Sequence, residues 1–282
     1  MESNCNICPR HCNIPRPYGF CGAGEQIKIS HTMLHRWEEP FISGTNGSGA
    51  VFFSGCSLGC VFCQNYKISS VCDGKEVTSQ QLRQIFDELI SQGAHNINLV
   101  TPTHFIHRII PALIPKLSVP TVYNCGGYEG DLKELSGLVD IYLADLKYGN
   151  NIAAARYSNA HDYVEVCMNA LEEMYRQTGD YVIQDGIMKK GVVVRHLVLP
   201  SNIENTLDAI DLFYKFAKGK KVKFSLMSQY IPQGKASDFP EINRTLTAEE
   251  YERAVNYVTR RGIRDCLIQE LDSANREFVP NF

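Results

Sequence analysis

Hydrophobic and polar residues follow two periods in turn along most of the chain, which predicts strands alternating with helices. Short apolar runs predict strands at 49–55, 96–102, 120–127, 139–148, 192–200 and 221–230, with a last short strand at 265–270. Helical patterns lie between them at 78–93, 103–117, 161–179, 203–219 and 247–262. Strands that alternate with helices indicate parallel pairing through right-handed crossovers.

Boundary signals support several of these helices. Thr78 with Gln81, and Thr247 with Glu250, match the capping-box pattern at the start of a helix. Pro111 and Pro115 predict kinks in the helical stretch 103–117, since proline lacks a backbone donor.

The fold class follows from the number of units. Six strand–helix units are too few for a closed eight-fold barrel, so we predict an α/β fold with a partial (β/α)6 TIM-like barrel over residues 49–282. Residues 1–48 contain many prolines and glycines, and we expect an irregular, cysteine-rich, metal-binding extension there. Ligands of such barrels bind where strands end, which marks Cys56, Thr101, Gly126, Asp145, Pro200 and Gln229 as candidates.

Charge and hydropathy exclude several classes of partner. The net charge of −3 gives no basic field that would attract nucleic acid. No apolar run approaches the roughly 20 residues that cross a membrane. The first residues, MESNCNICPRHC, lack the apolar core of a signal peptide, so we expect a cytoplasmic protein.

Cysteines provide the clearest chemical signal. The chain has eleven, and clustered cysteines in a reducing compartment are most often metal ligands or catalytic thiols. Cys56, Cys60 and Cys63 have C-x3-C-x2-C spacing directly after the first predicted strand. Cys72 follows closely, so a four-thiolate zinc site is one interpretation. The other is an iron–sulfur cluster with only three protein ligands, which leaves one iron open to a substrate or cofactor.

This loop resembles the signature of radical S-adenosylmethionine enzymes, in which an aromatic residue, here Phe62, precedes the last cysteine. The resemblance implies a [4Fe–4S] cluster on the three cysteines. It also implies that the open iron chelates the amino and carboxylate groups of S-adenosyl-L-methionine.

Residues at later strand ends extend the resemblance. Gly126 and Gly127 resemble the family's glycine-rich element, whose backbone meets the methionine amino group. Asp145 and Lys147 resemble the Asp-x-Lys element of glycyl-radical-enzyme activases, and a structural salt bridge is the alternative. The resemblance implies that Arg195 contacts the carboxylate or ribose of S-adenosylmethionine; pairing with Asp145 or Asp140 is the alternative.

One departure from the family pattern and one neighbouring residue limit these assignments. Activases carry an acidic residue at the end of the third strand, where this chain has Asn124, which puts any cation site there in doubt. His196, next to Arg195, is expected to be a core histidine with satisfied hydrogen bonds.

The wider sequence resembles proteins identified as pyruvate formate-lyase-activating enzymes, through segments spread over most of the chain. These are CPRHC (8–12), EEPFISG (38–44), GCSLGCVFCQN (55–65), INLVTPTH (97–104), YNCGGY (123–128), ADLKY (144–148) and RHLVLP (195–200). The resemblance implies an oxidoreductase that abstracts hydrogen from a glycine of a partner glycyl radical enzyme, with a reductant such as flavodoxin or ferredoxin. A small-molecule or other protein substrate is the alternative, and a non-catalytic metal-binding or electron-transfer module is a third interpretation.

Four further cysteines form a separate group. Cys5, Cys8, Cys12 and Cys21 have the spacing C-x2-C-x3-C-x8-C in a stretch with no local core. We predict a second metal site there, because four thiolates can order such a segment. Zinc is the simplest occupant, a second iron–sulfur cluster is the alternative, and four free thiols would be the structural explanation.

Overall fold

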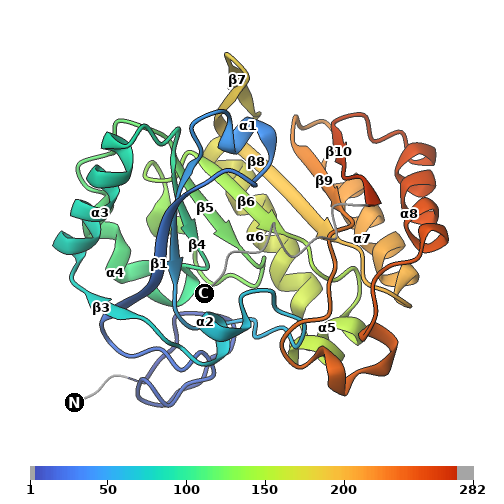
Figure 1. Cartoon of the computed structure of the whole chain (residues 1–282), viewed down its shortest axis with the longest axis horizontal. Coiled ribbons are helices and arrows are strands. Elements are labelled where there is room, and N and C mark those ends of the chain that lie inside the picture. The colour runs from blue at the N-terminus through green and yellow to red at the C-terminus, as the bar shows by residue number, and fades with distance from the viewer. Residues whose placement is uncertain (1–3, 272–282) are drawn as a thin grey trace.

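The computed structural model describes residues 4–271, which form one ten-stranded sheet surrounded by helices (Figure 1). The strands are β1 (Ile27–His35), β2 (Ser48–Phe53), β3 (Lys75–Val77), β4 (Ile97–Val100), β5 (Thr121–Cys125), β6 (Ile141–Asp145), β7 (Val182–Gln184), β8 (Ile187–Leu197), β9 (Lys223–Met227) and β10 (Cys266–Ile268). Their order is β10-β9-β8-β6-β5-β4-β2-β1-β3, and β7 pairs with β8 outside this path.

The central strands confirm the predicted parallel arrangement. Every neighbouring pair from β2 through β4, β5, β6, β8 and β9 to β10 is parallel, and each corresponds to a run expected from the sequence. Among the described residues the sheet is not closed, because β3 and β10 lie at opposite ends of the strand order. The molecule therefore has an α/β fold whose sheet resembles an open barrel.

Most predicted helices are present. The helices are α1 (Pro40–Ser43), α2 (Tyr66–Ser70), α3 (Ser79–Ser91), α4 (Ile106–Ile109), α5 (Asn151–Ser158), α6 (Tyr163–Thr178), α7 (Ile203–Phe216) and α8 (Ala248–Arg260). Both predicted capping boxes form, at the starts of α3 and α8. The single helix expected at 103–117 is wrong, since this stretch divides into a 3-10 turn, α4 and a second 3-10 turn with Pro111 at its start.

The expectation of an irregular segment over residues 1–48 is wrong for its second half. Residues 27–35 form β1, which pairs antiparallel with both β2 and β3. Ile27 and Ile29 alternate with polar residues and are buried, as in a strand with one face on the core. Residues 4–26 contain no helix or strand, as expected. In Figure 1 they lie as dark blue loops at the bottom, beside α2.

Side chains alternate between the two faces of the parallel strands, which separates the core from the pocket. On β5, Tyr123 packs into the large core that the helices cover, whereas Val122 packs in a second cluster with Phe41 and Ile42 of α1. Asn124, the next residue on the same face as Val122, lines a pocket. The inner face of the open barrel is therefore apolar beside α1 and polar towards the strand ends.

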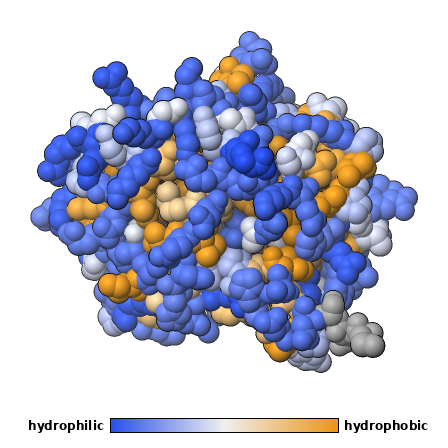
Figure 2. All heavy atoms as spheres, turned by 180° about the vertical axis from the view of Figure 1, so that it is seen from behind, coloured by the Kyte–Doolittle hydropathy of each residue, from blue (hydrophilic) through white to orange (hydrophobic). Residues whose placement is uncertain are grey.

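The face seen in Figure 2 is largely hydrophilic, with hydrophobic residues visible in scattered patches. No helix within residues 4–271 is long and apolar enough to cross a membrane.

Candidate active site

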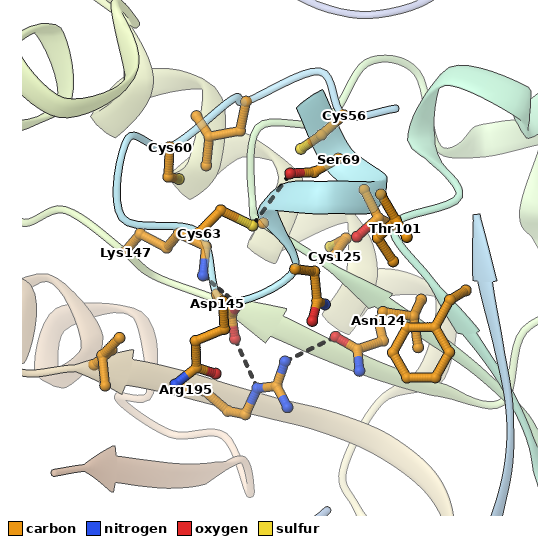
Figure 3. A pocket seen from close by; sticks show the side chains of 18 of the residues that line it. Cys56, Cys60, Cys63, Ser69, Thr101, Asn124, Cys125, Asp145, Lys147 and Arg195 are labelled. Carbon is orange, nitrogen blue, oxygen red and sulfur yellow. Dashed lines mark hydrogen bonds and ion pairs between the residues drawn. The ribbon is translucent and has the colours of Figure 1, made fainter. Parts of the chain in front are cut away.

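The largest group of chemically active side chains lines a pocket at the carboxyl ends of the parallel strands, where α/β folds bind ligands (Figure 3). Residues at or just beyond the carboxyl ends of β2, β4, β5, β6, β8 and β9 all reach it. Among them are Cys56, Cys60, Phe62, Cys63, Thr101, Asn124, Gly126, Asp145, Lys147, Arg195 and Gln229.

The structure brings Cys56, Cys60 and Cys63 to one side of this pocket, on the loop after β2 (Figure 3). We call residues 55–65 the three-cysteine loop. Ser69 Oγ donates a hydrogen bond to Cys63 Sγ at 3.4 Å. Burial raises the pKa of the Cys56 thiol to about 12, and the neighbouring Cys63 and Cys60 add to the increase. Burial and Cys60 also raise the pKa of Cys63. These thiols therefore need a cation to become thiolates at neutral pH.

The three-cysteine loop brings three thiols to one pocket. A zinc ion holds its sulfur ligands about 2.3 Å away, so they lie roughly 4 Å apart. Within residues 4–271, no three cysteine, histidine or acidic side chains are gathered closely enough to hold one ion. In a [4Fe–4S] cluster each cysteine binds its own iron, so the sulfurs lie farther apart. Three thiols on one loop of one pocket are a donor set that can hold such a cluster with one iron left open.

Cys72 lies beside the start of the three-cysteine loop but is not among the residues that line the pocket. A Cβ atom added to Gly55 would lie 3.4 Å from Cys72 Sγ and 2.6 Å from the backbone oxygen of Cys21. Burial raises the pKa of Cys72, and Cys21 is the thiol that adds to the increase. Cys72 therefore faces the N-terminal segment, which argues against a four-thiolate site with Cys56, Cys60 and Cys63.

Asp145, Lys147 and Arg195 form one buried ion-pair network (Figure 3). Lys147 Nζ lies 2.7 Å from one oxygen of Asp145, and Arg195 Nε lies 2.6 Å from the other. Burial favours the neutral acid, but Arg195 and Lys147 outweigh it and lower the pKa of Asp145. Burial also opposes the charge on Lys147, yet Asp145 and then Cys60 raise its pKa. The salt bridge expected as an alternative is present, and it holds a permanent cation close to the thiols.

Glu38 is a pocket residue that sequence reasoning missed. Its carboxylate accepts hydrogen bonds from Arg195 Nη1 at 2.8 Å and from the amides of Asn98 and Asn124, each at 3.0 Å. Arg195 Nη2 donates to Asn124 Oδ1 at 2.7 Å. Its sequence signals were the acidic pair before Pro40 and the place of that pair in EEPFISG (38–44), in a segment that we expected to be irregular. Glu38 reaches the pocket because the chain crosses the inner face of the sheet between β1 and α1.

The two glycines of the third strand end have different surroundings. Gly126 lines the pocket, and Tyr163 Oη lies 2.9 Å from its carbonyl oxygen. Gly127 has φ +77° and does not line the pocket; an added Cβ would lie 2.5 Å from the backbone oxygen of Asp145. Gly127 is therefore required by the turn and by packing, whereas Gly126 lines the pocket and its carbonyl oxygen accepts from the buried Tyr163.

Phe62 lines the pocket but is mostly enclosed by protein. Its ring makes edge-to-face contacts with Tyr148, Tyr157 and Tyr230, with centroids 6.3, 6.2 and 5.9 Å away. It therefore anchors the three-cysteine loop in the core, next to Cys63.

Thr101 has an unusual backbone conformation at the pocket. Its φ is +61°, which is rare for a β-branched residue, and its backbone N–H donates to Asn124 O at 2.8 Å. A residue in this conformation is strained and persists only where the surrounding structure holds it in place. Such residues are found most often at functional sites. By contrast, His196 is a core residue as expected, with Nδ1 2.7 Å from Leu146 O and Nε2 3.0 Å from Thr206 Oγ1.

The N-terminal cysteines lie near one another. Burial raises the pKa of Cys8 to about 12, and Cys21, Cys12 and Cys5 each add to the increase. The backbone N–H of Phe20 donates to Cys12 Sγ at 3.4 Å. Among the described residues, no three of these thiols are gathered closely enough to hold one metal ion. A zinc ion at this site therefore stays a prediction.

Comparisons with known proteins connect this site to iron–sulfur chemistry. Residues 43–104, which include the three-cysteine loop, match a family model described as a 4Fe-4S single cluster domain. The chain is 32% identical over 276 residues to the uncharacterized protein MJ0674 of Methanocaldococcus jannaschii, covering 92% of this chain and 75% of that protein.

Among solved structures, the crystal structure of methylornithine synthase has a similar fold. The TM-score is 0.50 at 15% sequence identity, over 76% of this chain. This chain spans 60% of the length of that structure. The likeness shows the shared fold.

Proposed function

The chain belongs to the family that includes MJ0674 of Methanocaldococcus jannaschii, and we propose that it is a radical S-adenosylmethionine enzyme. The match to a 4Fe-4S domain and the fold shared with methylornithine synthase support this superfamily. The observation that carries the proposal is the group of three thiols on one loop in a pocket at the strand ends; the fourth cysteine of the pocket, Cys125, lies on β5 and is buried in the core.

In this proposal Cys56, Cys60 and Cys63 hold a [4Fe–4S] cluster. Such a cluster, when reduced, supplies one electron that cleaves S-adenosylmethionine to methionine and a 5′-deoxyadenosyl radical, which abstracts hydrogen from the substrate. Lys147 contributes positive charge beside the thiols, which favours their deprotonation.

The remaining pocket residues bind and orient S-adenosylmethionine. The Gly126 backbone lies at the pocket, and its carbonyl oxygen, which accepts from Tyr163 Oη, keeps a second lone pair for an ammonium group. Arg195 is suited to a carboxylate, but its nitrogens already contact Asp145, Glu38 and Asn124. Arg195 therefore acts either by exchanging one of these partners or by orienting Asn124 towards the cofactor.

The substrate is the finer part of the proposal. The sequence resemblance favours a glycine of a partner glycyl radical enzyme, with flavodoxin or ferredoxin as reductant. The same chemistry acting on a small molecule is the second candidate, since the pocket is lined by polar side chains that can orient one. A glycyl radical signal in electron paramagnetic resonance, seen when a candidate partner is added with S-adenosylmethionine, would distinguish the two.

The central experiment is anaerobic reconstitution with iron and sulfide, followed by dithionite and S-adenosylmethionine. We expect 5′-deoxyadenosine and methionine from the native chain, and about four irons per three-cysteine site. Cys60→Ser should lose both the cluster and the product. Cys72→Ser is the matched control and should keep both, because Cys72 faces the N-terminal segment. A native chain that binds a cluster yet forms no 5′-deoxyadenosine would favour the electron-transfer interpretation.

A further inference from the structure

Arg10 extends from the N-terminal segment to the backbone of the three-cysteine loop. Its Nε donates to the carbonyl oxygen of Ser57 at 2.8 Å, and its Nη2 donates to that of Leu58, also at 2.8 Å. Both carbonyls lie between Cys56 and Cys60. The guanidinium group therefore holds the part of the loop that separates two of the candidate cluster ligands.

The same guanidinium group binds the carboxyl-terminal end of α5. Nη1 donates to Asn159 O at 2.5 Å, and Nη2 donates to Ser158 O at 2.7 Å. The last carbonyls of a helix lack partners within the helix and carry partial negative charge, so a cation is stabilised there. The loop also contacts this helix directly, because Val61 N–H donates to Tyr157 O at 2.9 Å. Arg10 thus joins the loop to a fixed helix end.

An aromatic ring from the N-terminal segment holds Arg10 in place. The guanidinium carbon lies 3.8 Å from the centroid of the Phe20 ring and 5.1 Å from that of Tyr128. Gly59 of the three-cysteine loop has φ +64°, and a Cβ added there would lie 2.8 Å from the Phe20 ring. The ring therefore lies directly on the loop backbone, and the contact leaves no room for a side chain.

We propose that Arg10 is a positioning residue that couples the N-terminal cysteine segment to the three-cysteine loop and so sets the geometry of the cluster ligands. The inference rests on the proposed cluster function. Arg10 lies between Cys8 and Cys12, so order imposed on those thiols also fixes the start of the Arg10 side chain.

Only arginine can make this contact. Four carbonyl oxygens converge on one side chain, and a guanidinium group offers five N–H donors in a fixed plane. Lysine offers three donors from a single nitrogen and cannot span the same acceptors. Without a cation among them, the four carbonyl dipoles would repel one another.

The first test measures the loop in the chain without a cluster, by hydrogen–deuterium exchange of backbone amides. We expect Arg10→Gln to speed exchange in residues 56–63 roughly tenfold or more, because it removes charge-assisted hydrogen bonds to the loop backbone, which are stronger than neutral ones. Arg10→Lys should restore part of the protection. Arg108→Gln is the matched control: Arg108 pairs with Glu25 of the same N-terminal segment at 2.8 Å, on the surface and away from the loop.

A second variant tests the coupling itself. Cys8→Ser with Cys12→Ser leaves Arg10 intact, and we expect it to speed exchange in residues 56–63 as Arg10→Gln does. Unchanged loop exchange in this variant would contradict the coupling to the N-terminal segment.

The last measurement is iron and sulfide bound after reconstitution, with the electron paramagnetic resonance spectrum of the reduced chain. We expect Arg10→Gln to bind less iron than the native chain and to show an altered spectrum. A native chain that assembles no cluster would contradict the proposed function. A native chain that assembles one, beside an Arg10→Gln variant with unchanged loop exchange and iron content, would contradict this inference alone.

Discussion

Glu129 is a buried carboxyl group on the helix-covered side of the sheet, behind the pocket. It is 4% exposed and accepts hydrogen bonds from Thr103 Oγ1 and Tyr123 Oη, each at 2.9 Å. Burial raises its pKa to about 7, although the donors Thr103, Tyr123 and Cys125 act in the opposite direction. The folded chain therefore binds a proton at Glu129 more tightly than the unfolded chain does.

This shift predicts a pH dependence of stability. Between about pH 4.5 and pH 7 the folded state holds more protons at Glu129 than the unfolded state, so its contribution falls as pH rises through that window. The total loss is about 3 kcal/mol, from roughly 1.4 kcal/mol per pKa unit. We expect Glu129→Gln, which imitates the protonated acid, to remove this loss.

Urea unfolding of both chains at several pH values measures the effect. The difference between the two chains is the quantity to follow, because burial also lowers the pKa of His104 and His196 to about 4, which destabilises both chains in acid. A difference that stays constant from pH 4.5 to pH 7.5 would contradict the prediction.

The sequence alone identified some residues of the pocket and missed others. Cys56 and Asp145 were found because each lies near a predicted strand end, and Arg195, inside the predicted strand 192–200, was found through the family resemblance. Glu38 was missed because its role arises only through contacts with residues 60 to 157 positions away. The sequence did not decide whether Cys72 is a fourth ligand, because the spacing of cysteines does not show which residues surround each thiol in the fold.

At the scale of elements, Gly149 controls how the chain leaves the pocket after β6. A Cβ atom there would lie 2.2 Å from Ala209 N and 2.3 Å from Asn205 O, both in α7. The backbone N–H of Gly149 also donates to Asn205 Oδ1 at 2.8 Å. The turn therefore packs against the helix backbone with no space for a side chain.

We expect Gly149→Ala to destabilise the chain by about 3 kcal/mol or more, because backbone atoms in a packed core cannot easily shift. Gly24→Ala is the matched control, since its Cβ would meet nothing within 4 Å and its φ is ordinary. Thermal unfolding of the two variants measures the difference. Equal melting temperatures would show that α7 moves aside at little cost.

Elements with strong local signals were predicted well, and those set by tertiary contacts were not. The capping boxes placed the starts of α3 and α8 at the observed residues. The stretch 103–117 breaks into short turns because Pro111 interrupts the backbone pattern and Thr103, His104 and Phe105 are all buried. β1 was missed because its partner β2 lies beyond an intervening turn and α1.

For the whole molecule, the chain between β1 and α1 crosses the inner face of the open sheet and joins its distant parts. Glu38 contacts Asn98 on β4, Asn124 on β5 and Arg195 on β8. One carboxylate thus bridges three strands of a sheet whose edges do not meet in the described residues.

We expect Glu38→Ala to lower the free energy of unfolding by about 3 kcal/mol, because it leaves a buried guanidinium donor and two amides without an acceptor. Glu38→Gln should cost less, since it keeps one acceptor oxygen. Urea unfolding measures both. Glu25→Ala is the control, because Glu25 is an exposed partner of Arg108 and such pairs contribute less than about 1 kcal/mol. Equal losses for Glu38→Ala and Glu25→Ala would contradict the bridging role.

Strand order was predictable at this scale, because alternating strands and helices allow few parallel topologies. The open edge of the sheet and the path of the chain between β1 and α1 across its inner face could not be predicted. Both depend on how β1 pairs and on buried polar contacts. The division of the cysteines into two groups followed from spacing, whereas the Arg10 contact between the groups required the three-dimensional structure.

The tyrosine enclosure of Phe62 has a consequence for electron transfer. Phe62, Tyr148, Tyr157 and Tyr230 are all nearly inaccessible to solvent, and they lie on the side of the loop next to Cys60. A cluster held there would be dry on that side, and a medium of low polarity disfavours the additional negative charge of the reduced state. If the chain holds the proposed cluster, we expect this enclosure to lower its reduction potential and to favour strongly reducing donors.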